Sequence, residues 1–159
     1  MPKTAPLYEE DLVRWTEVQA ANLRRAGQAR ANLPLDWLNL AEEIESLGRS
    51  QRRELRGRIA VIVEHLFKLE QSPAIEPRPG WIETIGRERR EIERLLEDSP
   101  SLRGELDRLV ALEDPRAASL AAETLARRGE IESAPRLPGE RPVYTAEQVL
   151  GDWLPEQKG

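Results

Sequence analysis

Five polar residues lie where chemistry could take place, because the helical wheel puts them on or beside apolar helix faces. At about 100° per residue, Gln19 falls within the apolar stripe of one predicted helix and Gln51 within that of the next. Arg58 and His65 share one flank of that second helix, and Glu88 lies in line with the apolar residues of a third. Buried ionisable groups gather at binding sites, so these residues predict a polar cluster able to hold a ligand. Arg58 is the expected counter-charge of Glu88.

The same cluster also has a structural interpretation, which we favour. Buried polar groups must find hydrogen-bond partners, and such networks often serve only to hold helices together. On this interpretation Gln19 and Gln51 bond between helices, Glu88 pairs with an arginine, and His65 is a satisfied structural histidine. A bound ion or small molecule beside these side chains would instead favour a binding site.

A metal site is the second possibility that the residues raise. Glu42 and Glu45 form an ExxE spacing on one helix, as in helical nucleotide pyrophosphohydrolases that hold magnesium with carboxylates. Such enzymes need a second acidic pair, but Glu64 is followed one turn later by the basic Lys68. The single histidine has Ile62 three residues before it, where a di-iron bundle needs glutamate, and the chain has no cysteine. We therefore expect no cofactor and lean against an enzyme, with a metal-dependent hydrolase using the LAEEIESLG face as the alternative.

The arginines raise a third possibility, a nucleic-acid partner, which we do not expect. Residues 49–58 (RSQRRELRGR) carry five arginines against one glutamate, yet the chain as a whole has a formal net charge of -5. No aromatic residues are interleaved to stack on bases. The longest uninterrupted apolar run, residues 59–63, is also far shorter than the roughly 20 residues that cross a bilayer. We expect a cytoplasmic protein whose partner is another protein or itself.

The spacing of apolar residues predicts the helices that carry these side chains. A first helix runs from Tyr8 to a C-cap at Gly27, and its stripe includes Leu12, Trp15 and Leu23. After Asp36 as N-cap, one long helix is expected from about Trp37 to Glu70, because its stripe keeps its register through Gly48. A break at Gly48 is the alternative. If the helix is continuous, we expect Gly48 at a close crossing with the first helix.

Proline, serine and aspartate mark the later helices. A third helix runs from Trp81 to Asp98, and the pairs Ser99-Pro100 and Asp114-Pro115 each predict a new N-cap with proline at the first helical position. Thr145 and Gln148 predict a capping box for a short last helix, after which Trp153 anchors the tail.

The 159 residues are therefore expected to fold as one domain, residues 1–159, of the all-α class. The prediction is a single helical bundle of about five helices with one long central helix, plus a short C-terminal helix. Residues 1–7 and 155–159 are expected to be loose tails, and residues 71–80 and 129–142 loops. The expected core draws on Trp15, Leu40, Ile44, Leu55, Ile59, Ile62, Leu66, Trp81 and Ile92.

Five segments resemble a bacterial protein family catalogued as domain of unknown function 29. They are LYEEDLVRW (7–15), NLAEEIESLGRSQRREL (39–55), EHLFKLEQSP (64–73), RREIERLLEDSPSL (89–102) and YTAEQVL (144–150). They stand in the expected order and cover nearly the whole chain, with Leu69 where a tryptophan is expected. The resemblance implies a compact all-helical bacterial protein and brings no established activity. Our hypothesis is a non-enzymatic helical protein-interaction module.

Overall fold

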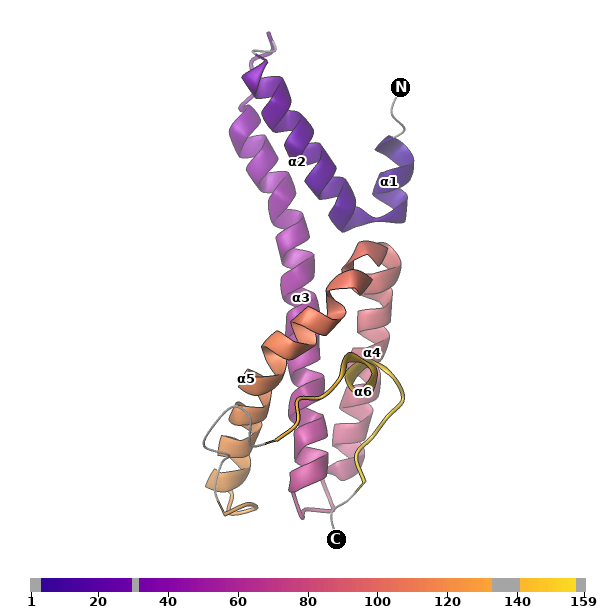
Figure 1. Cartoon of the computed structure of the whole chain (residues 1–159), viewed down its shortest axis with the longest axis vertical. Helices are drawn as coiled ribbons and strands as arrows, with labels where there is room; N and C mark the ends of the chain where they lie inside the picture. Colours follow the sequence, from indigo (N-terminus) through magenta and orange to yellow (C-terminus); the bar gives the residue numbers. More distant parts are fainter. Residues whose placement is uncertain (1–3, 30–31, 133–140, 157–159) are drawn as a thin grey trace. The chain divides into compact units, whose positions relative to one another are not determined.

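A computed structural model describes residues 4–29, 32–132 and 141–156, and they are helical without a single strand (Figure 1). The predicted all-α class is confirmed. The elements in chain order are α1 Thr4–Glu10, α2 Leu12–Gln28, α3 Trp37–Gln71, α4 Arg78–Asp98, the 3-10 helix η1 Pro100–Glu105, α5 Leu106–Arg127 and α6 Ala146–Leu150.

The chain divides into two compact units, each described here by itself. The first unit holds residues 1–55 and 94–104, and the second holds residues 56–93 and 105–159. The first therefore contains α1, α2, the beginning of α3, the end of α4 and most of η1. The second contains the rest of α3, most of α4 and the whole of α5 and α6.

The beginning of the chain differs from the predicted tail and single first helix. Residues from Thr4 onward are already helical, and α1 ends at Glu10 because Asp11 caps a new helix. The carboxylate of Asp11 accepts the backbone N–H of Arg14 at 2.9 Å, which satisfies one of the unbonded donors at the start of α2. The expected C-cap at Gly27 is also wrong, since α2 continues to Gln28.

Asp11 and Ser99 cap each other's helices within the first unit. A second set of bonds joins Asp11 to Ser101, whose N–H and hydroxyl it accepts at 2.7 and 3.0 Å. In return the Ser99 hydroxyl accepts the N–H of Val13 at 3.2 Å. Ser99 was expected to cap a helix opening at Pro100. That segment is instead the 3-10 helix η1, and the Ser99 side chain serves the N-terminus of α2.

The long helix α3 is unbroken over 35 residues, so the predicted continuity through Gly48 is confirmed. Gly48 lies at a close crossing with α2, as expected, because a Cβ there would lie 2.7 Å from the Thr16 hydroxyl oxygen. Thr16 is fully buried and donates that hydroxyl to the Val13 carbonyl at 2.6 Å. Figure 1 shows α2 beside the first half of α3, where the two form an antiparallel hairpin.

The predicted core is correct for the later part of the chain and wrong for part of the hairpin. Six of the nine expected residues are buried, namely Leu55, Ile59, Ile62, Leu66, Trp81 and Ile92. Leu40 is 40% exposed, and Trp15 and Ile44 are only half-buried. The helical wheel identifies a face that should be covered, and over residues 37–47 no described part of the chain covers it fully.

Helix α5 is continuous where a new helix was expected at Asp114-Pro115. Pro115 lies inside the helix, so the predicted N-cap at Asp114 is wrong. Asp114 instead accepts the N–H of Tyr144 at 3.1 Å, thirty residues away in the sequence. The predicted capping box of Thr145 and Gln148 is confirmed at the start of α6. In the loop expected over residues 129–142, residues 133–140 lie outside the described part of the chain, as do residues 157–159 of the expected tail.

The close crossing at Gly48 predicts a measurable loss of stability in Gly48→Ala. The added methyl would collide with a buried, hydrogen-bonded Thr16, so the free energy of unfolding should fall by about 1–3 kcal/mol. Gly57→Ala in the same helix is the control, because nothing lies within 4 Å of its added methyl. Helix propensity alone should make that variant neutral or up to about 1 kcal/mol more stable. Urea denaturation measures both, and a Gly48→Ala protein as stable as the parent would contradict the crossing.

Candidate functional site

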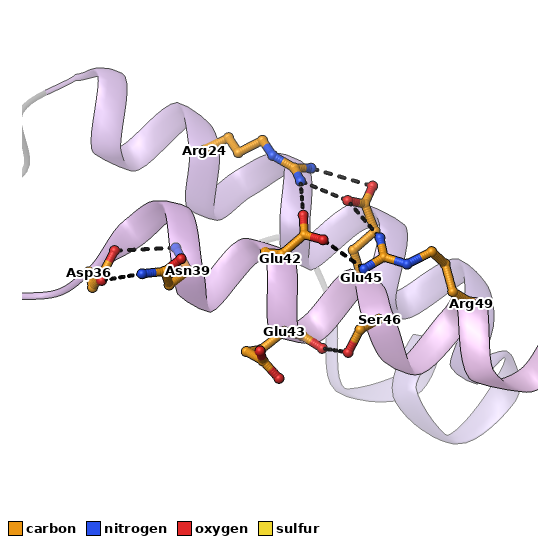
Figure 2. A network of polar contacts seen from close by, with 8 residues as sticks. All are labelled: Arg24, Asp36, Asn39, Glu42, Glu43, Glu45, Ser46 and Arg49. Atoms are coloured by element: carbon orange, nitrogen blue, oxygen red, sulfur yellow. Dashed lines mark hydrogen bonds and ion pairs between the residues drawn. The ribbon is translucent and has the colours of Figure 1, made fainter.

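The two candidate metal ligands, Glu42 and Glu45, lie in an alternating ring of charges with Arg24 and Arg49. Figure 2 shows Arg24 reaching from α2 to the two carboxylates on α3. Arg24 donates to Glu45 at 2.7 Å and lies 3.8 Å from Glu42, while Arg49 donates to Glu42 at 2.7 Å and lies 3.6 Å from Glu45. Each carboxylate therefore has two guanidinium neighbours. Arg24 also fastens α2 to α3.

The ring favours the ionised form of its carboxylates. The hydrogen bond from Arg24 lowers the pKa of Glu45 below its ordinary value, and the same bond raises the pKa of Arg24. A divalent cation at Glu42 and Glu45 would have to displace two arginines from oxygens that already carry charge-assisted hydrogen bonds. In the described part of the chain, no three acidic or histidine side chains are grouped so as to hold a metal ion. No observation favours the hydrolase alternative.

The predicted pairing of Arg58 with Glu88 is confirmed. Arg58 on α3 donates to a carboxylate oxygen of Glu88 on α4 at 2.9 Å, and Arg87 lies 3.4 Å from the other oxygen. Glu88 is only 8% exposed, so these contacts give a nearly buried carboxylate its counter-charge. Removing one partner of such a pair leaves the other charge desolvated, which gives the contact a clear structural role.

The other members of the predicted cluster are placed differently. His65 lies in the second unit with its Nδ1 at 2.8 Å from the Val61 carbonyl of the same helix, so in this contact Nδ1 donates. Gln19 and Gln51 belong to the first unit, where both are half-buried. The ligand-binding role of the five residues stays a prediction.

Sequence reasoning missed a polar clamp that fastens residues 141–144 to the helices of the second unit. Arg141 donates to Asp114 at 2.6 Å, and its guanidinium lies 4.7 Å from the centre of the Tyr144 ring. The Tyr144 hydroxyl in turn donates to Glu70 at 2.8 Å. Burial and this bond to a carboxylate both raise the pKa of Tyr144 above its ordinary value. The signal at Asp114 was visible in the sequence, but it resembled a helix cap.

Two arginines, Arg89 and Arg56, are engaged by carbonyls or by a carboxylate. Arg89 donates to the carbonyls of Gln148, Val149 and Trp153 at 2.7–2.9 Å, which caps the C-terminal end of α6 and holds the tail. Arg56 donates to Glu113 at 2.6 Å. These contacts give Arg89 and Arg56 structural roles.

A hollow lies where α1 meets α2, but its lining residues do not form a catalytic or metal-binding group. Its only carboxylates are Glu10 and Asp11, and Asp11 already accepts bonds from Arg14 and Ser101. The hollow is lined by Pro6, Leu7, Glu10, Asp11, Arg14, Val18 and Pro100.

The feature of the first unit that its own contacts leave unexplained is an apolar surface on the α2–α3 hairpin. Leu40 and Leu47 on α3 are 40% and 50% exposed. Their wheel positions put them beside the buried contact line of α3, on the same side of the hairpin as Leu23 of α2. We call this surface the hairpin face and define it by Gln19, Leu23, Leu40, Ile44, Leu47 and Gln51, all of them half-buried or exposed.

Comparisons with known proteins agree with this all-helical architecture. Residues 7–154 match the family described as domain of unknown function DUF29, so the chain belongs to that family. It is also similar to the crystal structure of an alpha-helical protein of unknown function from Rhodospirillum rubrum, at 29% identity and a TM-score of 0.73. That similarity covers 91% of this chain and 89% of the other. No protein of curated function matches the chain. Among the described helices, none combines the length and apolar character that spanning a membrane requires.

The ion-pair ring predicts a pH effect centred on Glu45. Because the fold lowers its pKa, Glu45 stabilises the protein above its unfolded pKa, and this contribution is lost as the pH falls through the lower folded value. Arg24→Gln should return the pKa toward the ordinary glutamate value and flatten the loss of stability on acidification. Arg25→Gln is the control, because Arg25 donates to Asn22 instead. An NMR titration of the Glu45 carboxyl carbon tests this, and equal pKa values in the parent and Arg24→Gln would contradict it.

Proposed function

We propose that this chain is a protein-interaction module that binds another protein, or a second copy of itself, through the hairpin face. The observation that carries the proposal is the exposure of Leu40 and Leu47 in the first third of α3, whose apolar stripe is fully buried from Leu55 onward. The bacterial source of the similar solved structure supports a bacterial protein, and a cytoplasmic location stays a prediction.

The stripe on α3 supports the proposal through its unequal burial. Leu55, Ile59 and Ile62 continue the same helix and are fully buried, whereas Leu47, two turns before Leu55, is half exposed. Fully burying a leucine is worth about 1.5–3 kcal/mol, so a half-exposed pair leaves a substantial part of that free energy unused. A partner that covers the hairpin face would gain it.

The polar groups of the hairpin also support an interaction surface over an active site, because the ion-pair ring lies on the other side of α3 from Leu47. Arg24, Glu45 and Arg49 are engaged with one another across the hairpin and leave its leucines outside the network. Contiguous apolar surface with a polar border is the usual composition of a protein–protein contact.

Photo-crosslinking in living cells tests the proposal. A chain carrying p-benzoylphenylalanine in place of Leu47 should form covalent adducts with its partner on irradiation. Leu38 is the matched control: it lies on the same helix at 70% exposure, but nine residues from Leu47 and so on the opposite side. Adducts are expected from position 47 and not from position 38. Equal yields, or no adduct from position 47, would contradict a docking role for this face.

Leu47→Ser separates loss of binding from loss of folding. Because Leu47 is half exposed, the free energy of unfolding of the isolated chain should change by less than about 1 kcal/mol, measured with urea at low protein concentration. Leu55→Ser, at a fully buried position of the same helix, should cost several times more. A severe loss in Leu47→Ser would mean that the hairpin face belongs to the core of the chain itself.

A further inference from the structure

The two outer edges of the hairpin face carry opposite charges. On α2 the edge is basic, because Arg25 donates to the Asn22 amide oxygen at 3.0 Å and its guanidinium is thereby held beside Asn22. On α3 the edge is acidic, because wheel positions put Glu43 and Glu54 there. Figure 2 shows the Glu43 side chain pointing away from Arg24 and from the ion-pair ring.

These edge charges also lie at the same height along the hairpin. Arg24 bonds to Glu45, so their neighbours Arg25 and Glu43 lie within about one helical turn of each other along the axis. They stand on opposite edges and therefore cannot bond within one hairpin. A surface that carries opposite charges on its two edges, at the same height, is complementary to the same surface of a second copy.

We propose that the partner of the hairpin face is a second copy of this chain, and that two hairpins form an antiparallel four-helix bundle with α2 of one copy on α3 of the other. The inference rests on the proposed function and names its partner. A two-fold axis parallel to the helices puts Arg25 of each copy beside Glu43 of the other, twice per dimer. An axis across the helices would stack α2 on α2 and α3 on α3, with like charges together. Charge therefore selects the first arrangement.

Charge reversal tests the arrangement in solution. Sedimentation equilibrium of the parent chain should show a monomer–dimer equilibrium. Arg25→Glu and Glu43→Arg should each weaken dimerisation roughly tenfold, since each change puts two like-charged contacts into the dimer. The double variant should recover most of the parent's affinity. Reversal of Glu93, an exposed acid outside the hairpin, is the control and should leave dimerisation unchanged. A dimer insensitive to both reversals would overturn the proposed pairing.

Disulfide trapping identifies which helices meet, because the chain has no cysteine of its own. Chains carrying Asn22→Cys and Glu43→Cys, mixed in equal amounts under mild oxidation, should form mixed disulfide dimers in excess of either homodimer. Homodimers formed mainly by Glu43→Cys alone would indicate α3 on α3 and overturn the arrangement. A parent chain that stays monomeric across the concentration series would overturn the second copy as partner. In that case adducts from position 47 with a different protein would still uphold the interaction module, whereas their absence would end both proposals.

Discussion

The apolar stripe of α3 is more stable when it is covered along its whole length. The rest of the structure depends on which part of the stripe this chain itself buries. From Ile59 to Leu69 the stripe is fully buried within the second unit. Before Leu55 the helix has α2 as its neighbour in the first unit, and α2 covers one side of it only. A helix of 35 residues cannot be stable on propensity alone, because isolated helices gain most of their stability from packing an apolar face. Most of the packing free energy that stabilises α3 therefore comes from its second half.

Bonds between residues far apart in the sequence fix the shorter elements. The Ser99 hydroxyl accepts the N–H of Val13 at the start of α2, and the Asp11 carboxylate accepts the N–H of Ser101 in η1, across 86 and 90 residues of sequence. Asp114 does the same for the backbone at Tyr144. Each of these side chains is a helix-cap residue by type, and Ser99 and Asp114 were expected to cap their own segments. A buried carboxylate has a strong requirement for donors, and the fold supplies them from wherever the chain returns.

Helical periodicity was enough to predict the long helix, the crossing at Gly48 and the pairing of Arg58 with Glu88. All three depend on positions within a regular helix, which a wheel gives directly. The break at Asp11, the uninterrupted α5 and the clamp at Arg141 were not predictable in this way, because their partners lie in distant segments. Leu40 shows a different limit. A wheel tells which face of a helix is apolar, but not whether this chain or another one covers it.

The composition of the α2–α3 contact explains why the leucines of the hairpin are left outside it. The buried positions on α2 are Val13, Thr16 and Ala20, and those facing them on α3 include Ala41 and Gly48. Small side chains let two helix backbones approach closely, and the ion pair of Arg24 with Glu45 then fastens one edge of the contact. The hairpin thus closes on small residues and charge, while Leu40 and Leu47 remain 40% and 50% exposed. A hairpin whose only task was to fold would gain more by closing on its leucines, since larger apolar side chains bury more surface. This closure on small residues leaves Leu40 and Leu47 available for the contact that we propose for the hairpin face.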